Sequence, residues 1–132
     1  MADDRPNIFL IMTDQQRGDC LGIDGHPVLQ TPYLDHVAAS GIRFSNAYSA
    51  CPVCTPARRT VLTGRKPSNH GVLVNHQAPL PWPTLAGELQ DAGYQTHLIG
   101  KSHWGPSPDE VGFDSHTLAG GPRAPGPGQD NE

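Results

Sequence analysis

A run of five consecutive apolar residues near the start of the chain restricts most strongly the fold that the chain can adopt. Residues 7–13 read Asn-Ile-Phe-Leu-Ile-Met-Thr, so that polar residues flank the run on both sides. An uninterrupted apolar run of this length is typical of a strand buried on both faces, as in a parallel sheet. The following residues, 14–30, are rich in Gly, Asp and Gln and are predicted to form a loop. Open α/β sheets bind their ligands at loops that leave the carboxyl ends of such strands.

Capping residues delimit the helices predicted for the rest of the chain. Thr31 and Pro32 predict a helix over residues 33–40, because Thr caps helices and Pro fits their first turn, and Gly41 would end it. Two further helices, each followed by a glycine, are predicted over residues 56–63 and 84–92. Short strands are predicted over residues 42–49 and 94–100, and a loop over residues 68–83. The resulting order of strand, helix, strand, helix, helix and strand predicts an α/β fold.

Composition argues against several classes of function. The formal net charge is −4 and the basic residues are scattered, so no nucleic-acid partner is expected. No apolar stretch approaches the length of a membrane span, so no membrane partner is expected either. The acidic N-terminus lacks the apolar region of a secretory signal, which predicts a cytoplasmic location. The chain has three cysteines, and an odd number argues against a disulfide framework.

The last fourteen residues differ from the rest of the chain. Residues 119–132 hold four glycines and three prolines and offer nothing that can pack. We therefore expect one segment of a catalytic domain over residues 1–118, followed by a Gly/Pro-rich loop or truncated tail over residues 119–132.

The segment Cys-Thr-Pro-Ala-Arg-Arg-Thr-Val-Leu-Thr-Gly, residues 54–64, combines a nucleophile with an anion site. Cys54 precedes a helix that Pro56 is predicted to begin. The amino end of a helix carries backbone N–H groups without partners and a partial positive charge, which favour both a thiolate and a bound anion. Arg58 adds a fixed cation within one turn. Cys54 and Arg58 are therefore candidate catalytic residues.

Cys51 and Cys54 also form a C-x-x-C pair, which leaves two other interpretations open. The pair is compatible with a redox dithiol or with half of a zinc site, although zinc would need two more ligands and none is obvious. Alternatively, the cysteines are simple buried thiols.

Two further groups of polar residues follow predicted strands. Asp14 and Gln15 come directly after the apolar run, and their oxygen atoms are ligands that Ca²⁺ or Mg²⁺ accepts. The alternative is that both are ordinary loop residues.

Lys101 and His103 lie in the segment Gly-Lys-Ser-His-Trp-Gly after the strand predicted over residues 94–100. A K-x-H pattern is weak evidence when taken alone, and Trp104 is expected to be a packing residue.

Taken together and in this order, the motifs resemble the N-terminal portion of the type I sulfatases. These are formylglycine-dependent enzymes of the alkaline-phosphatase-like superfamily, and their signature is C-x-P-x-R followed by a helix that ends in Thr-Gly. The resemblance implies that Cys54 is oxidised to formylglycine, whose aldehyde hydrates to a gem-diol. One hydroxyl attacks the sulfur of a sulfate ester and the other later expels sulfate. By the same resemblance, Arg58 steadies the modified residue, Lys101 contacts the sulfate and the formylglycine oxygen, and His103 acts as the base.

The resemblance also implies cofactors and partners. Asp14, Gln15 and the modified Cys54 would bind a divalent metal, with Ca²⁺ expected and Mg²⁺ or Mn²⁺ as alternatives. Gln15 stands where many family members have a second Asp. The partners would be a small-molecule sulfate ester and a formylglycine-generating or radical maturation enzyme. Ala57 replaces the Ser that is common in the motif, so conversion of Cys54 is expected to be incomplete.

The family is also much longer than this chain. Its fold is a mixed, mostly parallel sheet flanked by helices, and its metal site is completed by a later Asp followed by Asn or His. We therefore expect an incomplete fold and a fragment that is inactive by itself. Two alternatives remain: a phosphonate monoester or phosphodiester hydrolase of the same superfamily, and a non-catalytic truncated remnant.

Overall fold

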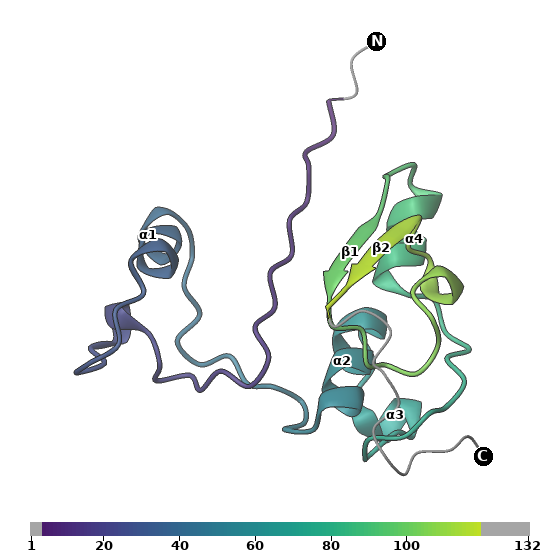
Figure 1. Ribbon diagram of the computed structural model, residues 1–132, viewed down its shortest axis with the longest axis horizontal. Helices are drawn as coiled ribbons and strands as arrows, with labels where there is room; N and C mark the ends of the chain where they lie inside the picture. The colour runs from purple at the N-terminus through teal and green to yellow at the C-terminus, as the bar shows by residue number, and fades with distance from the viewer. Residues whose placement is uncertain (1–3, 120–132) are drawn as a thin grey trace. The chain divides into compact units, whose positions relative to one another are not determined.

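The computed structural model describes residues 4–119, and the chain divides into two compact units, Met1–Ala47 and Tyr48–Glu132. The first unit holds the short 3₁₀ helix η1 (Gly22–Asp24) and the helix α1 (Pro32–Ser40). The elements of the second unit are α2 (Cys54–Thr63), α3 (Pro67–His70), α4 (Leu85–Asp91), β1 (His97–Gly100), η2 (Asp109–Val111) and β2 (Ser115–Leu118) (Figure 1). Apart from Ala119, the predicted tail lies outside the described residues.

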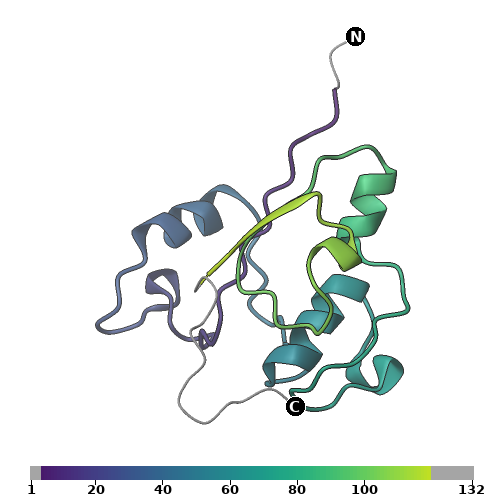
Figure 2. The same ribbon diagram turned by 45° about the vertical axis from the view of Figure 1, so that its right-hand side comes forward.

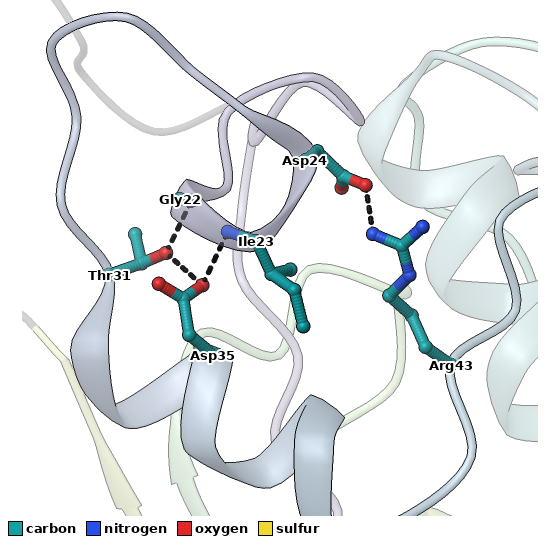
Figure 3. A network of polar contacts seen from close by, with 6 residues as sticks. All are labelled: Gly22, Ile23, Asp24, Thr31, Asp35 and Arg43. Atoms are coloured by element: carbon teal, nitrogen blue, oxygen red, sulfur yellow. Dashed lines mark hydrogen bonds and ion pairs between the residues drawn. The ribbon is translucent and has the colours of Figure 1, made fainter.

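In the first unit, a polar network ties η1 to α1. Asp35 Oδ1 accepts hydrogen bonds from the Ile23 N–H at 3.0 Å and from the Thr31 hydroxyl at 2.8 Å, and Thr31 Oγ1 accepts one from the Gly22 N–H at 2.8 Å (Figure 3). Asp24 also forms an ion pair with Arg43. A side chain at position 22 would collide with the Asp35 carboxylate, so the network requires glycine there.

The helix predicted over residues 33–40 is confirmed, with a correction at its start. α1 begins at Pro32 and is followed by Gly41. The Thr31 hydroxyl does not cap the helix, and its oxygen accepts from the Gly22 N–H of η1. The Thr31 carbonyl instead accepts from the Asp35 N–H at 2.8 Å. Thr31 therefore joins α1 to η1 in addition to beginning the helix.

The strands predicted over residues 7–13 and 42–49 are absent from the described part of the chain. Both segments are irregular and exposed, and residues 4–13 run as a trace without an arrow (Figure 1, Figure 2). Phe9 is 85% exposed and Ile11 is 68% exposed, which contradicts the expected burial. A strand exists only through hydrogen bonds to a neighbour, and no other strand within residues 4–119 pairs with these segments.

In the second unit, α2 starts earlier than its prediction and a turn of helix appears inside a predicted loop. Val53 is extended and precedes the first helical residue, Cys54, so that Pro56 still lies in the first turn. Gly64 ends the helix with φ +66°, as predicted. The loop predicted over residues 68–83 contains most of α3, which Gly71 ends with φ +72°. α2 packs against both α3 and α4.

The helix predicted over residues 84–92 is confirmed as α4. The Thr84 hydroxyl oxygen accepts from the Gly87 N–H at 3.0 Å and so caps the helix, as its position predicts. The same hydroxyl donates to the Val111 carbonyl at 2.6 Å. Gly112, with φ +92°, lies against Gly87, and a side chain at position 112 would come within 2.5 Å of the Gly87 nitrogen. This contact fixes η2 against the start of α4.

β1 and β2 form a parallel pair, although only part of this was predicted. β1 occupies the second half of the strand predicted over residues 94–100, and β2 was not predicted at all. The register places His97 opposite Ser115 and Gly100 opposite Leu118. A parallel pair needs a long crossover, which here is residues 101–114. Both strands point toward α2 in Figure 1, and the crossover leaves the carboxyl end of β1.

A small apolar core forms between this crossover and α2. Leu62, Trp104 and Val111 are buried, and Leu80, Leu98 and Phe113 pack around them. Trp104 stacks on Phe113 with ring centroids 5.9 Å apart, which confirms its predicted packing role. No helix within residues 4–119 combines the length and the apolar character that a bilayer span requires.

Candidate active site

Cys54 is the first residue of α2 and is half-buried. Its neighbour Thr55 is buried, and the Thr55 N–H donates to the side-chain oxygen of Asn75 at 2.9 Å. The sequence predicts a helix end whose N–H groups are all available to an anion. In the structure one of these donors, directly after Cys54, is already occupied.

Lys101 lies beside Cys54, and Arg58 binds the Lys101 backbone. Lys101 Nζ lies 3.8 Å from Cys54 Sγ, a distance compatible with a hydrogen bond to sulfur. Arg58 is buried and its Nη1 donates to the Lys101 carbonyl at 2.9 Å. Two motifs that lie far apart in the sequence are therefore brought together, since Lys101 contacts the Cys54 thiol and Arg58 binds the Lys101 backbone.

His103 is exposed and has an uncommon backbone conformation. Its φ is +53°, in the left-handed region that residues other than glycine rarely adopt. No hydrogen bond or ion pair joins its ring to another residue of the described chain. Such strained residues persist only where the surroundings determine the backbone, and they concentrate at functional sites. The structure fixes the backbone of His103 and leaves its ring open to solvent.

Asp14 and Gln15 belong to the first unit and are exposed. The Asp14 carbonyl accepts from the Gln16 N–H at 2.9 Å, which forms a tight turn after the apolar run. The side-chain oxygens of both residues are donors of the type that Ca²⁺ prefers, but such a site takes six to eight oxygens. Within residues 4–119 no group of three or more His, Cys, Asp or Glu side chains is arranged to hold a metal. The two residues therefore fit as part of a metal site and do not form one by themselves.

All three cysteines have free thiols. A zinc site at Cys51 and Cys54 would need two further ligands, and the described residues offer no such cluster. The Cys51 backbone is held locally, since its carbonyl accepts from the Ser49 hydroxyl at 2.7 Å. The contacts of Cys54 with Lys101 distinguish it from Cys51.

Two buried side chains that support α2 were not predicted. Arg59 is completely buried and donates to backbone carbonyls of Ala78, Pro79 and Trp104. Burial lowers its pKa, because the charged form loses contact with water.

His70 is also buried. Its Nδ1 accepts from the Val72 N–H at 3.2 Å, so its Nε2 carries the proton and faces the Pro56 carbonyl at 3.3 Å. The only feature of the sequence that pointed to either residue was the pair of adjacent arginines, Arg58 and Arg59.

The surface of the second unit has two shallow hollows, of about 460 and 470 Å³. One is lined by the loop around Ala78 and by Gly105, and the other by α4 and η2. Neither is lined by Cys54 or Lys101. We therefore take the side chains of Cys54, Lys101 and Arg58, and not the hollows, to define the candidate site.

Comparison with known proteins shows the family of the chain. The family described as Sulfatase matches residues 6–123. The chain belongs to the sulfatase family. It is 43% identical over 120 residues to an arylsulfatase of Clostridium perfringens, a match that covers 89% of this chain and 25% of that protein. To human arylsulfatase A it is 41% identical over 118 residues, covering 84% and 23%.

Solved structures support the same membership of the sulfatase family. One protein, solved in complex with its substrate D-glucosamine-2-N,6-O-disulfate, matches with a TM-score of 0.82 and 36% identity over 90% of this chain and 24% of that one. A phosphonate monoester hydrolase of Agrobacterium radiobacter matches with a TM-score of 0.76 and 31% identity over 86% and 26%. The prediction of an N-terminal part of an alkaline-phosphatase-like, sulfatase-type α/β fold is confirmed. The chain spans about a quarter of the length of these relatives.

Proposed function

We propose that the complete protein hydrolyses sulfate esters and that Cys54, once oxidised to formylglycine, supplies its nucleophile. The observation that carries this proposal is the contact of Lys101 Nζ with Cys54 Sγ at the first turn of α2, with Arg58 bound to the Lys101 carbonyl. Membership of the sulfatase family supports the reaction class. The partner that this requires is a formylglycine-generating or radical maturation enzyme.

In its modified form Cys54 would supply a hydroxyl that attacks the sulfur of the ester. Lys101, whose ammonium already lies next to position 54, would bind the sulfate oxygens and offset the negative charge that develops on them. Arg58 would keep the Lys101 backbone in place through its hydrogen bond to the Lys101 carbonyl and add positive charge to the site.

His103 would be the proton acceptor in this scheme. Its position two residues after Lys101 puts it on the same crossover, and its exposed ring has no competing hydrogen bond from residues 4–119. A positioned base of this kind contributes about 10²–10⁴-fold to a rate.

A divalent metal would supply charge stabilisation to the bound sulfate. Asp14 and Gln15 have suitable oxygen donors, and we propose Ca²⁺, with Mg²⁺ and Mn²⁺ as the alternatives to be compared. The modified residue at position 54 would be a third ligand. The remaining oxygen ligands that a hard cation requires would come from residues other than these three.

The substrate is proposed to be a small sulfate ester. Two kinds deserve direct comparison: an aryl sulfate, as the names of the curated relatives suggest, and a sulfated glucosamine, as in the complex of the structural relative. The similarity to a phosphonate monoester hydrolase adds a phosphonate monoester as the competing substrate class.

The test uses the complete protein produced together with a maturation enzyme. Mass spectrometry of the peptide that contains position 54 should show partial conversion of the cysteine to the aldehyde. The conversion should be incomplete because Ala57 replaces the usual Ser. The modified protein should hydrolyse an aryl sulfate or a sulfated glucosamine. Cys54→Ala should abolish hydrolysis, whereas the matched variant Cys51→Ala should retain most of it.

Each alternative predicts a different result of this experiment. Equal losses in Cys51→Ala and Cys54→Ala would favour a function of the C-x-x-C pair. A preference for a phosphonate monoester over every sulfate ester would favour the second hydrolase class. An unmodified thiol in every preparation, with no hydrolysis of either substrate class, would favour a non-catalytic remnant.

A further inference from the structure

Arg59 is a fully buried cation that is bound only by backbone carbonyls. Its Nε donates to the Trp104 carbonyl at 2.6 Å and its Nη1 to the Pro79 carbonyl at 2.9 Å, while Nη2 donates to the Ala78 carbonyl. No acidic side chain among residues 4–119 pairs with it. Hydrogen bonds from a charged donor are about twice as strong as those between neutral groups. Arg59 therefore joins three separate segments: α2, the loop at residues 78–79 and the crossover after β1.

Arg59 and its neighbour bind the two ends of one short segment. Arg58 donates to the carbonyl of Lys101, and Arg59 donates to the carbonyl of Trp104. His103 lies between these two anchors in the strained left-handed conformation. A strained residue needs surroundings that determine its backbone, and the two arginines provide this on both sides.

Gly105 makes the approach of Arg59 sterically feasible. Its φ is +115°, and a side chain there would come within 2.7 Å of Arg59 Nη2 and 3.0 Å of the Ala78 carbonyl oxygen. The guanidinium therefore fills the space that any larger residue at position 105 would need. The buried cation and the glycine form a single packing arrangement.

We infer that Arg59 is a positioning residue for sulfate-ester hydrolysis, which fixes Lys101 and His103 relative to Cys54 by holding the crossover against α2. This inference rests on the proposed function. Arg59 itself contacts no reacting atom, because its donors face backbone carbonyls. Displacement of a catalytic group by about 1 Å can cost about 10²-fold in rate, so the loss of this anchor should reduce turnover at a distance.

Lysine cannot replace this arginine. The guanidinium presents donors in a planar fork that reaches several acceptors at once, whereas an ammonium is a single point of charge on a flexible stem. Arg59→Lys should keep the charge and lose the geometry. Arg65, which is exposed and stacks on Trp82 at 5.5 Å, offers the matched control Arg65→Lys.

The experiment compares Arg59→Lys with Arg65→Lys and wild type in the complete protein. The value of kcat is divided by the formylglycine content from mass spectrometry, and it is measured at a temperature at which circular dichroism shows each variant to be folded. Hydrogen–deuterium exchange follows the amides of residues 101–105 and, for comparison, those of α4. We expect about a 10- to 100-fold lower kcat for Arg59→Lys, with faster exchange at residues 101–105 and unchanged exchange in α4. Arg65→Lys should match wild type.

Two results would overturn the inference. One is wild-type kcat in folded, modified Arg59→Lys, even with a lower melting temperature, because the residue would then only stabilise the fold. The other is unchanged exchange at residues 101–105, which decides the matter without any activity. If wild type itself hydrolyses no sulfate ester, the proposed function fails, and exchange alone decides whether Arg59 holds the crossover.

Discussion

The side-chain oxygen of Asn75 accepts a hydrogen bond from the backbone N–H of Thr55 at 2.9 Å, one residue after Cys54. Thr55 is 2% exposed, so this N–H is shielded from water in the folded protein. An exposed loop residue thereby completes the first turn of the helix that carries the candidate nucleophile.

We predict that Asn75→Ala destabilises the protein, because it leaves a buried N–H without a partner. The expected loss is about 1–3 kcal/mol of unfolding free energy, measured by urea denaturation. Asn69→Ala, at an exposed position of α3, is the control and should change stability much less. An Asn75→Ala protein as stable as wild type would show that the hydrogen bond contributes nothing.

A second prediction concerns charge at the same position. Asn75→Asp keeps an oxygen acceptor for the Thr55 N–H and adds a negative charge near Cys54, so it should stay folded and raise KM for an anionic sulfate ester. The increase should shrink as salt is added, since salt screens exposed charges. A KM that does not differ from wild type at low ionic strength would contradict the proposed binding of the sulfate at this helix end.

The third prediction is a pH dependence of stability that depends on Asp114. Hydrogen bonds from the Thr96 backbone, the Gln90 side chain and the Thr96 hydroxyl hold the pKa of Asp114 below its ordinary value of 3.8. The folded state thus favours the ionised carboxylate. Its contribution to stability is present above about pH 4 and is lost as pH falls below the unfolded-state value and through the lowered pKa.

Thermal unfolding of wild type and Asp114→Asn across pH 2–7 provides the measurement. The difference in melting temperature between them should be largest near neutral pH and should shrink in acid. Asp91→Asn, at an exposed position at the end of α4, is the control for removal of a carboxylate. A difference for Asp114→Asn that stays constant with pH would argue that the carboxylate charge has no part in joining the strands.

The fourth prediction concerns Gly22. A methyl group there would collide with the Asp35 carboxylate and disrupt the network between η1 and α1, so Gly22→Ala should accelerate hydrogen exchange over residues 22–35. Gly18→Ala should not, because open space surrounds that position. The effect of Gly22→Ala should be smaller in an Asp35→Ala background; equal effects in both backgrounds would mean that the collision is not the cause.

The helices could be predicted from sequence because their ends depend on local residues. Thr84, Gly41 and Gly64 act within a few positions of themselves, and all three mark helix ends in the structure. Strands depend on distant partners, which is why residues 7–13 and 42–49 were predicted wrongly. β2 went unpredicted for the same reason: all four of its residues are exposed, and hydrogen bonds from Thr96 to the Asp114 carboxylate hold its start beside β1.

The same distinction applies to the candidate site. Cys54, Arg58 and Lys101 could be selected because they stand in short motifs, and the structure brings them together. The metal ligands Asp14 and Gln15 and the catalytic role of His103 stay predictions. Arg59 and Asn75 were missed because their partners lie far along the chain, at Trp104 and Thr55, and no local pattern announces such a contact.

The hydrogen bonds of Arg59 depend on the backbone conformation of its partners and not on their side chains, because the acceptors are all backbone carbonyl oxygens. Substitutions at positions 78 and 79 can therefore accumulate without loss of its hydrogen bonds, whereas a side chain at position 105 would displace it. Among related sequences, arginine at position 59 should be inherited together with glycine at position 105, while positions 78 and 79 diverge. Positions 59 and 105, although distant in the chain, would then be substituted only together. Sequences that keep both residues would form a subgroup with the same arrangement of this part of the site.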